Sequence, residues 1–237
     1  MNDASFALRV ERVGRPGAAV APTLVLLPAA ATTADDFVRE GFIDELDALG
    51  IDATVLSAAV PVDVYAADRV VALVKAQIGT TTGAAPAPIW FVGVSLGAMT
   101  ALASAEAHRG TVAGVFAIAP WPGPRGLWSD VPAIGLATWA VRQREARFDD
   151  ERRVWRWLGE GADGGPQVMI GYGRNDRFAE GQELLASAVP SAHRFVIDGG
   201  HDWPTWKALW RAFLRRQQRR WLRATSDDRS GTPDVGR

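Results

Sequence analysis

The sequence of 237 residues contains no cysteine. Disulfide bonds, thiolate metal sites and a cysteine nucleophile are therefore excluded. The absence suits a reducing cytosol, although it does not require one. Histidine is also scarce, with three residues in the whole chain, so any role that needs an imidazole has few candidates.

The sequence also lacks an excess of positive or negative charge. The chain has 26 Lys and Arg against 27 Asp and Glu, which gives a formal net charge of -1. This balance does not favour a polyanion such as nucleic acid, or an anionic membrane surface. The cationic residues near the C-terminus belong to a predicted helix whose aromatic stripe packs against the sheet. We therefore interpret them as offsetting the dipole of that helix rather than as a nucleic-acid interface.

Long hydrophobic runs and cofactor motifs are absent as well. The apolar stretches are short and interrupted by Pro and Gly, so none of them could span a bilayer. The first residues lack a basic segment followed by an apolar one, so no signal peptide is expected. Phosphate-binding loops, dinucleotide fingerprints and clusters of metal ligands are missing, so we expect no cofactor and no metal. We expect a cytoplasmic protein whose partner is a small molecule, and the sequence leaves its oligomeric state open.

Short runs of β-branched and aromatic residues alternate with longer segments of helical periodicity. Strands are predicted at residues 6–13, 23–27, 51–56, 89–92, 112–119, 167–171 and 194–197. Helices are predicted at residues 34–49, 62–78, 96–108, 180–188 and 205–222. This alternation predicts an α/β fold with a mostly parallel sheet and helices on both faces. We expect one domain over residues 1–223, a cap of short helices inserted at 120–165 and a disordered tail at 224–237.

One tight turn of the sequence carries a motif associated with a nucleophilic serine. Gly93, Ser95 and Gly97 match the pattern G-x-S-x-G, between a predicted buried strand and an Ala-rich predicted helix. A serine that projects from such a turn has a strained backbone, and the two glycines remove side chains that would clash there. The helix N-terminus favours negative charge that develops beside the serine. A serine that only caps the helix is the alternative interpretation.

The segment IWFVGVSLGAMTALA around Ser95 resembles the nucleophile elbow of the α/β-hydrolase superfamily. The order of strands and helices also fits that superfamily from about residue 20 to residue 222. The resemblance implies a three-layer α/β/α sandwich with a sheet of about seven to eight strands and a small helical cap. It also implies a serine hydrolase of the esterase type that forms an acyl-enzyme. Haloalkane dehalogenases and epoxide hydrolases would require Asp at position 95.

His201 is the predicted base. It follows the last predicted strand directly, and the two glycines before it free the loop to bend. His108 lies in the last turn of a predicted helix, several turns from Ser95. His193 lies at the wrong end of the last strand for a site at the carboxyl ends of the strands. The sequence Gly-Gly-His-Asp-Trp at 199–203 is also similar to the superfamily pattern, in which an aromatic residue follows Gly-Gly-His.

Asp176 is the predicted acid of the triad. It follows the last strand but one, and the chain order Ser, acid, His is the order that α/β-hydrolases use. Its role would be to hold the imidazole in the right tautomer and to stabilise the imidazolium. Asp198 and Asp202 are the competing acids, although a side chain so close in sequence to His201 seldom reaches its Nδ1. An Asx-turn is the structural alternative for Asp176.

A tetrahedral intermediate needs two hydrogen-bond donors for its oxyanion. The backbone N–H of Leu96, directly after the nucleophile, is the first predicted donor. The second should come from the loop after the strand at 23–27, where this chain has Pro28-Ala29-Ala30 and many relatives carry His-Gly. Pro28 has no N–H, so we predict Ala30 as the donor and Ala29 as the alternative.

Five of the ten tryptophans fall in the predicted cap, at positions 121, 128, 139, 155 and 157. Aromatic side chains over the site would favour an apolar acyl or aryl group, with Trp121, Trp128 and the later Trp203 as predicted substrate contacts. Packing of the cap onto the body is an equal alternative. The sequence thus predicts hydrolysis of a carboxylic ester. Cleavage of a thioester or amide by the same triad, and a non-catalytic ligand-binding protein, are the alternatives.

Overall fold

The computed structural model describes residues 7–13, 21–59, 88–143, 150–162 and 164–227. Within these ranges the strands form one seven-stranded sheet in the order β1-β3-β2-β4-β5-β6-β7. The strands are β1 (Ala7–Val13), β2 (Thr23–Leu27), β3 (Ala53–Ala59), β4 (Ile89–Val94), β5 (Val112–Ile118), β6 (Gln167–Gly173) and β7 (Arg194–Ile197). All neighbours pair in parallel except β1, which lies antiparallel to β3 at one edge. The predicted mostly parallel sheet is confirmed, with a strand count at the lower end of the predicted range.

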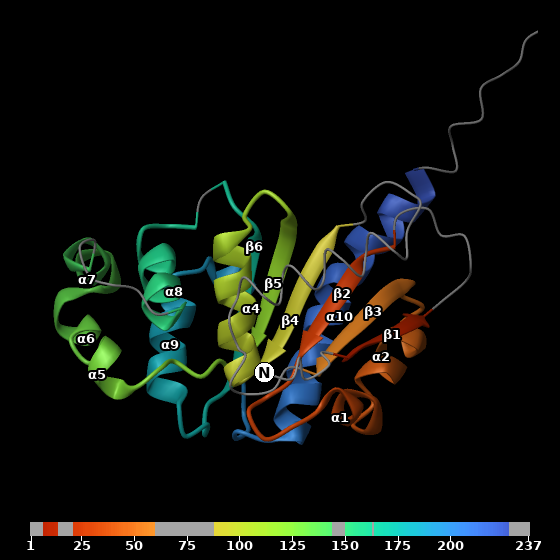
Figure 1. Ribbon diagram of the computed structural model, residues 1–237, viewed down its shortest axis with the longest axis horizontal. Helices are drawn as coiled ribbons and strands as arrows, with labels where there is room; N and C mark the ends of the chain where they lie inside the picture. The colour runs from red at the N-terminus through yellow and green to blue at the C-terminus, as the bar shows by residue number, and fades with distance from the viewer. Residues whose placement is uncertain (1–6, 14–20, 60–87, 144–149, 163, 228–237) are drawn as a thin grey trace, which may run out of the picture.

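Helices cover both faces of this sheet (Figure 1). One face packs against α1 (Ala34–Arg39), α2 (Phe42–Ala48) and α10 (Trp203–Asp227). The opposite face packs against α4 (Leu96–Ala107), α8 (Asp150–Gly159) and α9 (Ala179–Ser187). Each face therefore has its own hydrophobic cluster, and the three-layer α/β/α sandwich is confirmed.

Strand β2 shows why the central strands have continuous apolar runs. All five of its residues are buried, because helices cover the sheet on both sides. Leu24 and Leu26 belong to the cluster under α10, whereas Val25 and Leu27 belong to the cluster under α4. Alternate side chains of a strand point to opposite faces, so a strand buried on both faces is apolar at every position.

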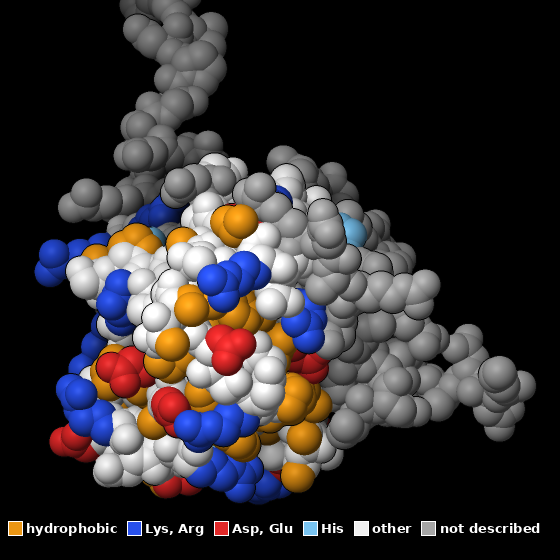
Figure 2. Space-filling model, turned by 90° about the vertical axis from the view of Figure 1, so that its left-hand side faces the viewer, with side chains coloured by type: hydrophobic (Ala, Val, Ile, Leu, Met, Phe, Trp, Pro, Cys, Tyr) orange, Lys and Arg blue, Asp and Glu red, His pale blue; other side chains and the backbone are white. Residues whose placement is uncertain are grey.

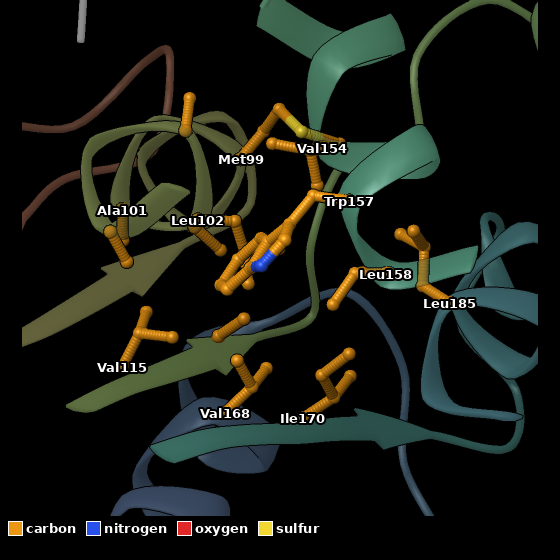
Figure 3. Close-up of a cluster of buried hydrophobic side chains, with 14 of the residues drawn as sticks. Met99, Ala101, Leu102, Val115, Val154, Trp157, Leu158, Val168, Ile170 and Leu185 are labelled. Carbon is orange, nitrogen blue, oxygen red and sulfur yellow. The ribbon is translucent and has the colours of Figure 1, made fainter. Parts of the chain in front are cut away.

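The segment between β5 and β6 contains several short helices, as predicted. They are α5 (Arg125–Trp128), α6 (Val131–Ile134), α7 (Leu136–Arg142) and the longer α8. Helix α8 lies beside α4 in the helical layer, and Figure 3 shows its Trp157 directed toward Leu102 of α4 and the strands below. Figure 2 shows the end of the molecule near α5–α7, where positive and negative side chains are interspersed with hydrophobic ones. The last part of the predicted cap therefore belongs to the body of the fold.

Some predicted boundaries differ from the observed ones. The single helix expected at 34–49 is two helices, because Gly41 between them has a φ of 77° and ends the first one. The last helix continues to Asp227, so its end overlaps the tail predicted from residue 224. The helix predicted at 62–78 and residues 228–237 lie outside the described residues. None of the helices in the described ranges is long and apolar enough to cross a membrane.

Candidate active site

Ser95 occupies the sharp turn between β4 and α4. Its φ of 53° and ψ of -114° are unusual for a residue with a side chain, as predicted for a strained turn. A Cβ at Gly93 would collide with the backbone of Gly97, where the helix begins. A Cβ at Gly97 would collide with the carbonyl oxygens of Leu27 and Pro28. The two glycines of the motif therefore permit two close backbone contacts, one inside the turn and one with the loop after β2.

The loop after β5 holds the strained serine through its backbone. The N–H of Ser95 donates to the carbonyl of Ile118 at 2.9 Å, and the N–H of Trp121 donates to the carbonyl of Ser95 at 3.0 Å. Ala119 in the same loop also has a positive φ, of 46°, and its N–H donates to Gly171 at 2.6 Å. These bonds fix the main chain of Ser95 on both sides.

The side chains of Ser95, His201 and Asp176 meet at the carboxyl ends of the strands. Nε2 of His201 lies 2.9 Å from Oγ of Ser95, and Nδ1 lies 2.7 Å from Oδ2 of Asp176. The tautomer with its proton on Nδ1 satisfies both contacts, since it donates to the carboxylate and accepts from the hydroxyl. The structure thus brings together the three residues predicted from the sequence.

The carboxyl group of Asp176 is buried and multiply hydrogen-bonded. Burial raises the pKa of Asp176, but hydrogen bonds from the His201 side chain and the Phe178 N–H outweigh it, so its pKa lies below the ordinary value. The Phe178 N–H donates to Oδ1 at 2.8 Å, which leaves Oδ2 for His201. Asp176 is therefore ionised at neutral pH and can stabilise a positively charged imidazole.

Two aromatic rings hold the imidazole of His201 in place. Phe178 and Trp206 each lie 5.1 Å from it between ring centroids, and both are inclined to it by 86°. The loop that carries His201 is fixed as well, because the Gly200 N–H donates to Oγ1 of Thr205 at 3.0 Å. Sequence reasoning missed Phe178, and it assigned Trp206 to the packing stripe of the last helix.

Gln182 on α9 is a further buried polar residue that sequence reasoning missed. Its side chain is fully buried, and its Nε2 donates to the carbonyl of Pro120 at 3.2 Å. It also helps to lower the pKa of the Asp176 carboxyl group. Gln182 therefore connects the loop of the acid to the loop that holds Ser95. A single glutamine in a helix gives no sequence signal for this role.

The competing acids have other partners. Oδ1 of Asp202 accepts the N–H of Thr205 at 3.0 Å, which places it at the beginning of α10 as a helix cap. Asp198 is exposed and pairs with Arg174 at 3.4 Å. The geometry therefore favours Asp176 over both.

The other two histidines lie away from Ser95. His108 ends α4, a helix of 12 residues that begins directly after Ser95. His193 ends the short 3-10 helix η2 (Ser191–His193) before β7, and its Nε2 lies 3.0 Å from Nε2 of Gln167. Burial lowers the pKa of His193. Among the described residues there is also no group of three or more His, Asp or Glu that could hold a metal ion.

The two predicted oxyanion donors lie on adjoining segments. Leu96 is the first residue of α4, where a helix leaves its N–H groups without partners. Ala30 lies in the turn after β2, and the close contact of Gly97 with Pro28 brings that loop against the start of α4. Within the described ranges, neither the Leu96 N–H nor the Ala30 N–H donates to a protein acceptor. Ala29 is buried, whereas Ala30 is exposed.

A cavity of about 290 Å³ adjoins the triad. Its lining residues come from two segments and are Trp121, Pro122, Gly123, Pro124, Arg125, Trp128, Arg177, Phe178, Glu180 and Gly181. Trp121 is the residue bonded to the Ser95 carbonyl, and Phe178 contacts His201, so the cavity borders the site on that side.

The predicted aromatic contacts divide into two groups. Trp121 and Trp128 line the cavity. Trp203 packs instead against Phe37 and Phe42, with ring centroids 5.9 and 5.7 Å away, because α10 begins there and packs against α2. The tryptophans at 139, 155 and 157 are buried in the hydrophobic cluster on the face of the sheet that α4 and α8 cover. Packing is therefore the observed role of these three.

Several solved structures share this architecture. FphF of Staphylococcus aureus, a fluorophosphonate-binding serine hydrolase, matches with a TM-score of 0.63 at 11% identity, over 90% of this chain and 98% of its own. An S-formylglutathione hydrolase from Agrobacterium tumefaciens matches with a TM-score of 0.60 at 17% identity, over 93% and 100%. A monoacylglycerol lipase from Paleococcus ferrophilus matches with a TM-score of 0.57 at 15% identity, over 91% and 99%.

No protein-family model matches the sequence, and no curated protein matches it either. At these identities the structural matches establish the fold. The chain therefore has the α/β-hydrolase fold, as the resemblance around Ser95 implied.

Proposed function

We propose that the protein is a serine esterase that cleaves carboxylic esters through an acyl-enzyme on Ser95. The observation that carries the proposal is the continuous chain of contacts from Oγ of Ser95 through His201 to Asp176, with distances of 2.9 and 2.7 Å. This arrangement activates a hydroxyl group as a nucleophile, since the base contacts it directly and the acid orients the base. The hydrolases with a similar fold support the same chemistry.

The reaction begins when Oγ of Ser95 attacks the ester carbonyl carbon while Nε2 of His201 takes the hydroxyl proton. The carbonyl electrons move to oxygen, and the resulting oxyanion accepts hydrogen bonds from the N–H groups of Leu96 and Ala30. The intermediate then expels the alcohol, which receives the proton from His201. A water molecule that gives its proton to His201 attacks the acyl-enzyme, and Ser95 regains its proton as the acid leaves.

We prefer a carboxylic ester to an amide or a thioester as the bond that the protein cleaves. The same triad serves all three, and the monoacylglycerol lipase among the similar structures favours the ester. A thioester stays the second candidate, because S-formylglutathione hydrolases also share the fold.

Labelling with a fluorophosphonate tests the nucleophile directly. We expect one label on Ser95, located by mass spectrometry of the digested protein, because the probe reacts with an activated serine. Ser95→Ala should remove the label, whereas the neighbouring Ser104→Ala on α4 should retain it. A folded protein without label on Ser95 would support the non-catalytic alternative.

The base is tested by hydrolysis of 4-nitrophenyl butyrate. Without the imidazole of His201, no group would take the proton of the Ser95 hydroxyl as it attacks the ester. His201→Ala should lower kcat by at least about a thousandfold. Full activity in that variant would refute the assignment of His201.

A further inference from the structure

The cavity beside the triad is narrow and aromatic. One wall is the segment 121–128 after β5, and the other is the segment 177–181 at the start of α9. The walls meet at Gly181, where a Cβ would lie 2.6 Å from Cβ of Pro122 and 3.1 Å from the ring of Trp128. A cavity of about 290 Å³ between such walls accommodates a short group of a substrate rather than a long acyl chain.

The charges that line this cavity do not cancel. Arg125 and Glu180 form a two-pronged ion pair, with distances of 2.9 Å from Nη1 to Oε2 and 3.0 Å from Nη2 to Oε1. Their charges therefore neutralise each other. The third charged residue, Arg177, has its guanidinium 4.9 Å from the ring centre of Phe178. In the described part of the chain Arg177 has no carboxylate partner, so one positive charge at the cavity is uncompensated.

One aromatic ring contacts both this charge and the triad. Phe178 lies 4.9 Å from the guanidinium of Arg177 and 5.1 Å from the imidazole of His201. The backbone of Phe178 is fixed by the hydrogen bond of its N–H to Asp176. The aromatic ring that supports the guanidinium is thus part of the surroundings of the triad, and the exposed head of Arg177 remains available to a substrate.

We propose that this cavity selects short esters that carry a carboxylate, and that Arg177 binds the carboxylate. The guanidinium presents a planar set of N–H donors that matches a carboxylate with two parallel hydrogen bonds. The carbon chain between the ester and the carboxylate packs against Trp121 and Phe178. Half-esters of short dicarboxylic acids and esters of carboxyphenols are substrates of this kind. The inference rests on the proposed esterase function and adds the substrate class.

Two pairs of esters test the inference and separate its two possible orientations. The first pair is 4-nitrophenyl hemisuccinate and 4-nitrophenyl butyrate, and its acidic member carries the carboxylate in the acyl part. The second pair is 3-carboxyphenyl butyrate and phenyl butyrate, and its acidic member carries the carboxylate in the alcohol part. For each pair, the ratio of kcat/KM between the acidic and the neutral ester is compared in the wild type, Arg177→Gln and Arg174→Gln. Arg174 is the matched control, because it is exposed on the same loop, pairs with Asp198 and does not line the cavity.

We expect Arg177→Gln to lower this ratio about fivefold in one pair, mainly through KM, as for a partly exposed ion pair. The ratio of the wild type should also fall with added salt, and Arg174→Gln should keep the wild-type ratio. Equal ratios in the wild type and Arg177→Gln for both pairs, or an equal loss in both arginine variants, would overturn the inference.

Fluorophosphonate labelling of the same samples separates this inference from the proposed function. If the protein is labelled on Ser95 and hydrolyses 4-nitrophenyl butyrate, but Arg177→Gln does not change the ratio of kcat/KM as expected, only the role of Arg177 is overturned. If the folded protein is neither labelled nor active, the esterase proposal is overturned, and the substrate class with it.

Discussion

Two residues with side chains have a positive φ in the described part of the chain, and both are at the site. Ser95 and Ala119 are neighbours in space, because the Ser95 N–H donates to the carbonyl of Ile118, the residue before Ala119. Such conformations cost of the order of 1–3 kcal/mol each and persist where the surroundings impose them. The hydrogen bonds to Ile118 and from Trp121 supply that constraint for Ser95.

Gln182 should act as a positioning residue for Asp176. Gln182→Met keeps the side-chain volume and removes the amide that donates to the Pro120 carbonyl and helps to lower the pKa of Asp176. We expect kcat to fall about tenfold with little change in KM, because the substrate does not touch this residue. The pKa of Asp176 should rise, since a side chain that helps to lower it is lost.

Gln217→Met is the matched control for this prediction. Gln217 is also a buried glutamine, but its Nε2 contacts the sulfur of Met169, below the opposite face of the sheet. Its substitution should leave kcat and KM as in the wild type. The same kcat in both variants would contradict a positioning role for Gln182.

The sequence allowed the three central residues of the site to be predicted, but not those around them. Ser95 has a motif, and Asp176 and His201 follow strands whose carboxyl ends must share one rim of a parallel sheet. Gln182 and Phe178 have no such local signal. Their contacts depend on how α9 packs beside β6, which the pattern of a single helix does not specify.

At the scale of elements, the turn from β4 to α4 should tolerate no added carbon at Gly97. Gly97→Ala places a methyl group against the carbonyl oxygens of Leu27 and Pro28, at the end of a buried strand that has little freedom to move. We expect the free energy of unfolding to fall by about 2–3 kcal/mol and kcat/KM by at least about a hundredfold, because the loop with Ala30 is displaced. Urea unfolding and ester hydrolysis measure the two effects.

Gly110→Ala provides the comparison, because a Cβ at Gly110 would meet no atom within 4 Å. That variant should match the wild type in both measurements. If Gly97→Ala behaves like Gly110→Ala, the close contact between the helix and the loop after β2 is not needed for the site.

Elements with a strong local signal were predicted well, and those defined by packing were not. The buried strands β2, β4 and β6 appear in the sequence as apolar runs, so their positions were found within two residues. The break between α1 and α2 depends on the positive φ of Gly41, and a glycine in the sequence permits this conformation but does not predict it. The role of α8 could not be predicted, because its charged residues suggest a surface helix and only its contact with α4 shows it to be part of the layer.

At the scale of the whole molecule, one ion pair joins elements that are far apart in the sequence. Glu45 on α2 pairs with Arg211 on α10, with 2.8 Å between Nε and Oε2. The hydrogen bond from Arg211 lowers the pKa of Glu45 and outweighs the effect of burial, and Lys207 and Arg215 lower it further. Because the folded state binds this proton more weakly than the unfolded chain, the pair stabilises the fold above the ordinary pKa of 4.5 and loses its effect as pH falls below it.

We therefore expect Glu45→Gln to lower the free energy of unfolding by about 1 kcal/mol at neutral pH. The difference from the wild type should shrink as the pH is lowered through the region of that pKa, as measured by urea unfolding at a series of pH values. Glu183→Gln is the control, because Glu183 is exposed on α9 and has no ion pair in the described ranges. A difference that stays constant with pH would show that Glu45 acts through packing instead.

Helix α10 starts two residues after His201 and extends for 25 residues, which is about 37 Å. Figure 1 shows that it runs from the rim where the parallel strands have their carboxyl ends to the rim where they have their amino ends. The terminal turn of this helix is thus remote from the mouth of the cavity. Tethering the protein to a bead or an electrode at this turn should leave the rim with Ser95 facing the solution, so the immobilised protein should retain any ester hydrolysis that the free protein shows.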